Sequence, residues 1–473
     1  MDAPAADPCK AHLDRVRGWF DAHPQPLGWA SLGYRRMLAR YFSVLIPAEA
    51  SILEVGCGRG DLLALLPGRR RVGIDLSPAA IGAARLRAPE CEFHVQPGES
   101  LELAERFDFI IISDTLNLAA DAQRILERLH TVAHPGTRLV VNYPSALWRP
   151  VLAGASLLGL KTRAPQSNWL TRADVSGLMT LADWAVISHQ ARILCPVGAA
   201  GIGHLVNRWV APLAPFFCLS AFTVARAARD PKTGPMVVSV VVPARNEAGN
   251  IEAAVLRTPE MGAGTELIFV EGNSTDETWQ EIQRVAAKYP ARRIKTLKQQ
   301  GKGKGDAVRA GFAAAEGDLF IILDADLTVS PEELPKFYDA VASGRTEFAN
   351  GSRLVYPMEK EAMRFLNMCA NKVFGILFTW LLGQPLKDTL CGTKVLRRAD
   401  YERIVANRGY FGDFDPFGDF DLLFGAARLS MKIVDVPVRY RDRTYGSTNI
   451  HRWSHGWLLL RMVLFAGRKL KFI

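Results

Sequence analysis

The chain has 473 residues, of which 49% are hydrophobic and 22% are charged. This length exceeds one ordinary hydrophobic core, so we expect two or three domains, and the composition excludes a disordered or repeat protein. The net charge of +10 is modest for the length. It favours phosphorylated substrates or anionic lipid as partners, because the sequence has no Arg/Lys-rich run with interleaved aromatics to indicate a nucleic-acid groove.

The seven cysteines are scattered, and none has the spacing of a zinc site or a redox pair. We therefore expect reduced thiols and a cytoplasmic protein. Residues 1–17 lack the apolar core of a signal peptide. The longest apolar stretch, 209–225, contains Pro212 and Pro215 and is too short and broken to span a bilayer. Membrane contact is accordingly expected to be peripheral, on the inner face.

A glycine-rich turn follows the first expected strand, at residues 51–55. Glycines let a ligand approach the backbone, and the helix expected at 61–66 would offer free amides. A second strand ends at Asp75, about 20 residues beyond the first turn glycine, where an acid can hold ribose hydroxyls. Such a turn also fits NAD, but its Gly-x-Gly-x-Gly spacing differs from the dinucleotide pattern. The turn glycines are Gly56, Gly58 and Gly60.

An acid, Glu54, precedes this turn, and strand-like segments follow at 107–116 and 138–142. Over residues 40–145 the chain resembles the class I S-adenosylmethionine-dependent methyltransferases. The resemblance implies that Glu54 and the three glycines surround the methionine part of S-adenosylmethionine, and that Asp75 holds its ribose.

Three further positions bear on that resemblance. The family often has an acid after the third strand to meet the adenine, and only Gln96 or Glu99 could substitute for it here. Asp114 lies where methyl-acceptor groups often sit, although a helix N-cap explains it equally well.

The rest of the first half is less regular. Residues 168–174 indicate a capped helix start, and 218–226 a last strand. The apolar stretches 151–160 and 193–219 form either a lid over a hydrophobic acceptor or buried packing. The first domain is expected to end at residue 229.

A Pro/Gly-marked linker at 230–235 separates this domain from a second one, 236–473, in which strand–helix alternation restarts. One strand of this domain, at 320–323, ends at Asp324 and Asp326. Residues two apart on a strand project to the same side, so both carboxylates can face one ligand. Such a pair suits Mg²⁺ or Mn²⁺ held together with substrate phosphates, whereas a solvated acidic turn is the alternative.

Seven segments of this half resemble, in order, the family 2 glycosyltransferases with the GT-A fold, particularly the dolichyl-phosphate mannose synthase type: residues 242–251, 269–278, 324–326, 350–353, 388–398, 418–421 and 443–450. The resemblance implies a metal ion at Asp324 and Asp326. It also implies a nucleotide-sugar donor contacted by Pro243, Glu247, Glu271, Asp324, Asp326 and Arg353. The family commonly has aspartate where Glu271 stands.

The acceptor decides which catalytic groups are needed. A hydroxyl must lose a proton, for which Asp419 and Asp421 are the candidate bases, although Asp421 could instead orient the site. A lipid phosphate is already anionic and needs a cation, and Arg443 matches the arginine that meets such phosphates in the resembling enzymes. Asn449 stands where those enzymes usually have a lysine, so both acceptor classes stay open.

Two apolar segments fit interfacial helices and core helices about equally well: residues 374–382 and 457–465. Arg468, Lys469 and Lys471 follow the second segment. The fold class we expect is α/β, with two doubly wound domains, a Rossmann-like methyltransferase and then a GT-A glycosyltransferase. The expected function is metal-dependent, inverting sugar transfer to a lipid-phosphate or glycan acceptor, plus S-adenosylmethionine-dependent methylation, in glycan or glycolipid biosynthesis. The alternatives are a non-catalytic methyltransferase-like module and, from charge alone, an RNA methyltransferase.

Overall fold

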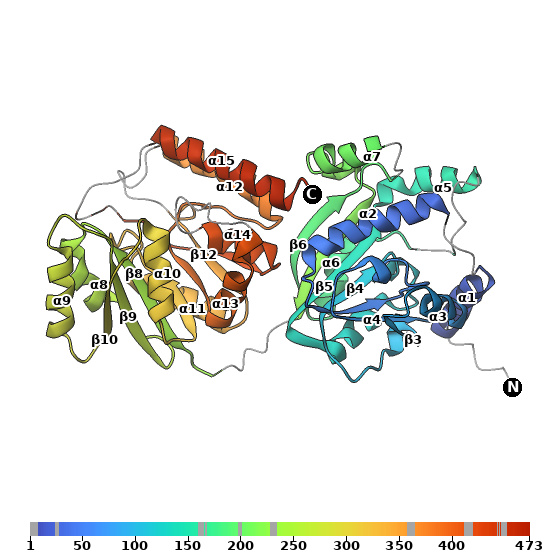
Figure 1. Ribbon diagram of the computed structural model, residues 1–473, viewed down its shortest axis with the longest axis horizontal. Coiled ribbons are helices and arrows are strands. Elements are labelled where there is room, and N and C mark those ends of the chain that lie inside the picture. Colours follow the sequence, from blue (N-terminus) through green and yellow to red (C-terminus); the bar gives the residue numbers. More distant parts are fainter. Residues whose placement is uncertain are drawn as a thin grey trace. The chain divides into compact units, whose positions relative to one another are not determined.

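The computed structural model describes residues 8–23, 28–158, 165, 168–196, 201–227, 234–356, 365–410, 420–441, 443, 445 and 452–473 (Figure 1). The chain divides into two compact units, Met1–Ala228 with Phe472–Ile473, and Arg229–Lys471. In the described residues, each unit contains a mixed seven-stranded sheet flanked by helices. Both units are therefore α/β, as the sequence predicted. The predicted linker, 230–235, lies mostly outside the described residues, so its bounds stay a prediction.

The first sheet has the strand order β3-β2-β1-β4-β5-β7-β6. Its first five strands are parallel, and β7 runs antiparallel to both of its neighbours. The parallel strands are nearly continuous apolar runs because helices cover them, and Leu53, Ile110 and Val141 are fully buried. The strands are β1 (Ser51–Val55), β2 (Arg70–Asp75), β3 (Glu92–Val95), β4 (Phe107–Ser113), β5 (Ala133–Pro144), β6 (Trp184–Arg192) and β7 (Ser220–Ala227).

The helices of the first unit are α1 (Pro8–Ala22), α2 (Trp29–Leu45), α3 (Pro78–Arg87), α4 (Ala122–Arg128), α5 (Arg149–Leu157), α6 (Arg172–Leu181) and α7 (Ile202–Leu205). The predicted start of α6 is confirmed, since Thr171 and Asp174 form a reciprocal capping box. The helix predicted at 61–66 is wrong, because only a 3₁₀ turn, η1 (Leu63–Leu65), forms there. Leu62, Leu63 and Leu66 pack into the core, and Gly68 at φ 136° turns the chain away immediately afterwards.

The second sheet has the order β10-β9-β8-β11-β13-β12-β14, with β13 antiparallel to β11 and β12. β8, β9, β10 and β11 are parallel, so their carboxyl ends meet at one edge. The strands are β8 (Val237–Ala244), β9 (Gly264–Glu271), β10 (Arg293–Lys298), β11 (Leu319–Ile322), β12 (Phe348–Ser352), β13 (Lys394–Arg397) and β14 (Ile433–Pro437).

The helices of the second unit are α8 (Ile251–Arg257), α9 (Thr278–Lys288), α10 (Lys304–Ala314), α11 (Leu334–Ala342), α12 (Phe365–Leu382), α13 (Arg398–Ala406), α14 (Phe420–Arg428) and α15 (Arg452–Leu470). The helices α12 and α15 lie side by side (Figure 1). Each buries part of its surface in the core, through Phe378 and Met462 for example. Among the described helices, none is long and apolar enough to cross a bilayer.

Candidate functional sites

A pocket of about 290 Å³ lies at the carboxyl edge of β8, β9 and β11 in the second unit. Segments far apart in the sequence meet there, because the parallel strands all end at this edge. The pocket is lined by Pro243, Ala244, Arg245, Glu247, Val270, Gly272, Gln299, Gly303, Lys304, Ala307, Asp324, Ala325, Asp326 and Arg443. Five of the residues singled out from the sequence are thus brought together: Pro243, Glu247, Asp324, Asp326 and Arg443.

Asp324 is paired with a lysine at the start of α10. The Lys304 Nζ atom lies 2.6 Å from its Oδ1. Burial alone would raise the pKa of Asp324, but the neighbouring cations, Lys304 first and then buried Lys394, hold it below the ordinary value. Gly392 makes room for the pair, since a Cβ at that position would lie 2.0 Å from Asp324 Oδ2 and 2.4 Å from Lys304 Nζ. The carboxylate is therefore charged and closely surrounded.

Asp326 is paired with Arg443, which also contacts Glu247. Arg443 Nη2 lies 2.5 Å from Asp326 Oδ2, and its Nη1 lies 3.1 Å from Glu247 Oε1. The other Asp326 oxygen accepts hydrogen bonds from Thr328 N and Oγ1 at 3.1 and 2.9 Å. Burial raises the pKa of Glu247, and the guanidinium of Arg443 opposes that shift. One arginine thus links two acids of the pocket.

The donor atoms around this pocket fit a hard divalent cation that is shared with a ligand. Asp324 and Asp326 supply carboxylate oxygens to one cavity, which is the ligand type that Mg²⁺ and Mn²⁺ prefer. In the part of the chain that the structure describes, no three His, Cys, Asp or Glu side chains group closely enough to hold a metal by themselves. A cation here would therefore need further oxygens, such as those of a diphosphate or of water.

Other predicted residues of this half lie apart from the pocket lining. Glu271 ends β9 and accepts a hydrogen bond from Ser274 N at 2.5 Å. Arg353 is buried in a two-pronged pair with Asp388, at 2.7 and 2.9 Å. Asp421, in the first turn of α14, lies 3.2 Å from Arg408. Their predicted roles in donor binding and catalysis stay predictions.

Two predicted positions, Asp419 and Asn449, lie outside the described residues. Two polar side chains of the pocket lining, Arg245 and Gln299, were missed from the sequence. Both directly follow a strand, β8 and β10, so the strand-end rule that picked out Asp324 could have found them.

The glycine turn of the first unit leaves a gap at its centre. Gly56, Gly58 and Gly60 have φ values of 73°, 53° and 69°, which favour glycine. A Cβ on Gly56 would clash with Thr115 at 2.2 Å, and one on Gly60 would meet Phe93 at 2.9 Å. A Cβ on Gly58 would meet nothing within 4 Å. Gly56 and Gly60 are thus required for packing, and Gly58 borders free space.

The environment of Glu54 fits a cofactor that carries a positive charge. It is almost fully buried, and its Oε2 has no hydrogen-bond partner among the described residues. Burial raises its pKa to about 8, with Arg35 opposing and Asp75 adding to the shift. Asp75 lies at the end of β2 and accepts hydrogen bonds from Gly58 N at 2.8 Å and Ser77 N at 2.9 Å. A buried carboxylate with one oxygen free of partners among the described residues, just before a glycine turn, fits the amino group of S-adenosylmethionine.

The two candidates for an adenine contact have backbone partners. Gln96 Oε1 accepts a hydrogen bond from Glu102 N at 3.1 Å. Glu99 Oε1 accepts one from Ala120 N at 3.0 Å. An adenine role for either residue stays a prediction.

Asp114 follows β4 at φ 51° and belongs to a polar cluster. It accepts a hydrogen bond from Asn142 Nδ2 at 3.0 Å, and Arg35 Nη1 lies 3.5 Å away. The N-cap position of the next turn is held by Thr115. Arg35 and its neighbour Tyr34, which hydrogen-bonds Ser220 at 2.7 Å, come from α2 and were missed from the sequence.

Comparison with known families finds one family model that matches part of each unit. Residues 46–177 match the model described as "Methyltransferase domain", and residues 239–405 match "Glycosyl transferase family 2". The chain therefore contains a methyltransferase domain, matched over residues 46–177, followed by a family 2 glycosyltransferase domain, matched over residues 239–405.

The glycosyltransferase domain has curated relatives. A dolichol-phosphate mannosyltransferase of Pyrococcus furiosus is 31% identical over 223 residues, 46% of this chain and 59% of that protein. An undecaprenyl-phosphate 4-deoxy-4-formamido-L-arabinose transferase of Edwardsiella ictaluri is 38% identical over 216 residues, 45% of this chain and 62% of that protein. The chain therefore spans less than two thirds of the length of these relatives.

Two solved structures are similar to parts of the chain, one to each half. Glucosyl-3-phosphoglycerate synthase of Mycobacterium tuberculosis, in complex with Mn²⁺, uridine diphosphate and glucosyl-3-phosphoglycerate, has a TM-score of 0.37 at 19% identity, covering 51% of this chain and 81% of its own. An S-adenosylmethionine-dependent methyltransferase of Thermotoga maritima has a TM-score of 0.33 at 16% identity, covering 46% and 98%.

Proposed function

We propose that the glycosyltransferase domain transfers a sugar, with inversion and in a metal-dependent reaction, from a nucleotide-sugar to a lipid phosphate. The observation that supports this most is the pocket in which Asp324 and Asp326 face the same cavity, each beside a cation. Such a combination of acids and cations suits a metal-bound diphosphate.

Each pocket side chain has a distinct part in this proposal. Asp324 and Asp326 would hold Mg²⁺ or Mn²⁺, which neutralises the charge that develops on the departing nucleoside diphosphate. Lys304 and Arg443 lie at the same carboxylates and would turn to the diphosphate oxygens. Glu247 and Pro243 line the β8 side of the pocket, where the nucleoside would lie.

The acceptor proposed is a lipid phosphate because a phosphate needs no general base. A phosphate oxygen is already anionic and attacks without a general base, but it must be attracted by a cation. Arg443 lies in the pocket, and its five N–H donors allow it to bridge the diphosphate of the donor and the phosphate of the acceptor. A glycan hydroxyl would need a base; of the two candidates, Asp421 is paired with Arg408, and Asp419 lies outside the described residues. Relatives named for dolichol phosphate and undecaprenyl phosphate also favour a lipid phosphate.

We propose that the methyltransferase domain binds S-adenosylmethionine and methylates a molecule of the same glycan or glycolipid pathway. Its support is the buried carboxylate of Glu54, one oxygen of which has no partner among the described residues, on the strand that runs into the turn where Gly58 borders open space. The second candidate is a non-catalytic module, and it is favoured by Asp75, whose two oxygens already accept hydrogen bonds from Gly58 N and Ser77 N.

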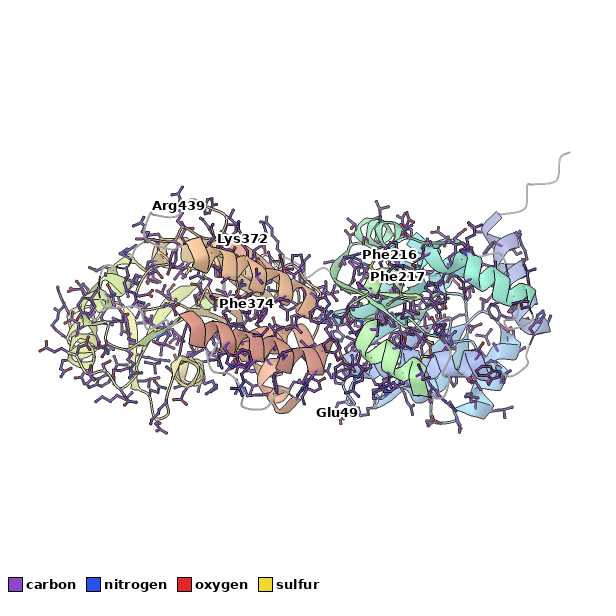
Figure 2. The ribbon with its side chains drawn as sticks, turned by 90° about the horizontal axis from the view of Figure 1, so that it is seen from above. Glu49, Phe216, Phe217, Lys372, Phe374 and Arg439 are labelled. Carbon is purple, nitrogen blue, oxygen red and sulfur yellow. The ribbon has the colours of Figure 1, made fainter. Side chains whose placement is uncertain are left out.

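We further propose peripheral membrane contact through α12 and α15. Val373 and Ile376 on α12 and Trp457 and Leu464 on α15 are more than half exposed. Figure 2 labels Lys372 and Phe374 on α12. Exposed apolar side chains beside basic ones are typical of interfacial helices.

The deciding experiment is a screen of nucleotide-sugars with Mn²⁺ or Mg²⁺, in which nucleotide release is measured with and without polyprenyl phosphate. We expect release with one donor, dependence on the metal, and acceleration by the lipid phosphate. Release that is accelerated by glycans but not by polyprenyl phosphate would move the acceptor to the glycan class. Activity that is unchanged in EDTA would overturn the metal assignment.

A further inference from the structure

The first unit has an apolar surface made of residues 147–158 and 202–217, here called the α5–α7 surface. Its most exposed large side chains are Leu157, Leu158, Ile202, Leu213, Phe216 and Phe217, each at least 58% exposed. Elsewhere in this unit, exposed apolar side chains such as Leu86 and Leu181 lie on separate helices. Scattered ones need no explanation, but a contiguous patch marks an interaction site.

The two segments of this surface are joined to each other. Trp148 Nε1 donates a hydrogen bond to the Phe217 carbonyl at 2.8 Å, and Ser145 N donates one to Leu219 O at 2.6 Å. The rings of Phe216 and Phe217 contact each other edge to face, with centroids 5.2 Å apart. Figure 2 labels these two phenylalanines. The start of α5 and the turn that carries Phe216 and Phe217 therefore meet.

Packing within the unit does not account for this surface. Every residue of α5 is described, and none of them is buried. The helix has nine residues, and three large apolar side chains in it or next to it are exposed: Val151, Leu157 and Leu158. Packing against its own unit therefore stabilises this helix little. A partner that removes these side chains from water would supply the missing stabilisation.

The charges indicate what that partner is. Residues 145–173 and 184–229 contain no Asp or Glu. The ionisable side chains on the surface are basic, with Arg149 exposed and the Arg208 guanidinium 5.4 Å from the Trp209 ring. Trp, Phe and Leu combined with Arg and no acids are typical of segments that adsorb to anionic lipid. A second copy docked through the same surface would instead bring two positive rims together.

We propose that the α5–α7 surface of the methyltransferase domain adsorbs to an anionic lipid bilayer. Both segments leave the sheet at the end of β5 and the start of β7, where Pro144 pairs with Ser220. This is the same edge of the sheet at which β1 runs into the glycine turn. A methyl acceptor held in the bilayer would thus meet the unit at its cofactor edge. The adsorption itself requires neither methyl transfer nor sugar transfer.

The test uses the full chain and vesicles of phosphatidylcholine with or without phosphatidylglycerol. The surface variant combines Leu213→Ser, Phe216→Ser and Phe217→Ser. The matched control combines Leu86→Ser, Leu181→Ser and Leu256→Ser, three exposed leucines elsewhere. Both are made in a Trp457→Ser/Leu464→Ser background, so that contact through α15 is reduced. We expect the surface variant to bind anionic vesicles at least tenfold more weakly than the control, which should match its parent.

Amide exchange gives a local readout that does not depend on these variants. In the wild-type chain, anionic vesicles should protect residues 147–158 and 202–217, and phosphatidylcholine alone should protect them much less. Unchanged exchange in both segments would overturn the proposal. A second outcome would also overturn the proposal. In it, sedimentation velocity shows that the wild type is a dimer and the surface variant a monomer, while both bind vesicles equally. Thermal unfolding of the full chain verifies that the variants fold.

Discussion

Arg443 Nη2 lies 2.5 Å from Asp326 Oδ2, although 117 positions separate the two residues in the chain. The contact brings the C-terminal part of the glycosyltransferase domain to the end of β11. It also means that Asp326 has a cationic partner in the protein itself, which a metal ion would have to replace.

We predict that Asp326→Ala lowers metal-dependent sugar transfer at least 100-fold, because it removes one of two metal-binding carboxylates and leaves Arg443 without its closest acid. Nucleotide release in saturating Mn²⁺ is the measurement. Asp339→Asn, a change at an exposed acid on α11, should leave the rate unaltered. Retained transfer in the Asp326 variant would remove the assignment of this site.

Gly392→Ala should weaken Mn²⁺ binding about tenfold or more in the presence of nucleotide. Its new methyl group would lie 2.0 Å from Asp324 Oδ2, so the carboxylate has to move away from the pocket or from Lys304. Titration of Mn²⁺ followed by electron paramagnetic resonance measures the effect.

Gly409→Ala is the matched control, since a Cβ there meets nothing within 4 Å. It should bind Mn²⁺ as the wild type does. Equal affinity in both variants would show that Asp324 does not hold the metal.

For the methyltransferase domain, Gly58→Arg should abolish binding of S-adenosylmethionine, because a large side chain would fill the open space at the glycine turn and would have to adopt a φ of 53°. Calorimetry is the measurement. Gly82→Arg, on the exposed side of α3, should bind like the wild type. A wild-type protein that binds no S-adenosylmethionine would favour the non-catalytic module.

Glu54 should make stability fall as pH rises. Its pKa is raised by burial from 4.5 to about 8, so between these values the folded state holds a proton that the unfolded state has lost. The stabilisation is complete below pH 4.5 and is lost towards pH 8, by up to about 1.4 kcal/mol per pH unit. Glu54→Gln should remove this slope. Urea unfolding of both proteins from pH 5 to 8 measures the difference, and parallel curves would contradict the prediction.

Arg353→Ala should destabilise the second unit by about 3 to 5 kcal/mol, because it leaves the buried carboxylate of Asp388 without its cation. Arg257→Ala, which breaks a more exposed pair with Glu332, should cost less than about 1 kcal/mol. Denaturant unfolding compares the two. If Arg353 instead contacts the donor directly, Arg353→Lys should raise the KM for the nucleotide-sugar without a comparable loss of stability.

The strands that carry both sites were predictable because each is a short apolar run that ends at glycines or acids. The strand expected at 51–55 is β1, and the run before Asp324 is β11 (Leu319–Ile322). Residues two apart at a strand end face the same side, so Asp324 and Asp326 could be grouped from the strand itself, whereas Glu247 was grouped with them only by the family resemblance.

Side-chain partners were not predictable, since they depend on how distant elements pack. Nothing local indicates that Arg353 faces Asp388, or that Arg35 of α2 lies beside Asp114. The helix expected at 61–66 failed for the same reason. Its leucines gain more from packing into the core than from a further helical turn, and Gly68 allows the chain to leave.

The two salt bridges of the pocket have a consequence for how donor and metal arrive. Asp324 and Asp326 are each already neutralised, by Lys304 and Arg443. A divalent ion that enters alone must displace both cations from these carboxylates. An ion that enters with a diphosphate brings the oxygens that receive them. Binding at this site thus exchanges the protein's own cations for the metal ion on the two carboxylates. As a consequence, metal and nucleotide should each bind tightly only in the presence of the other.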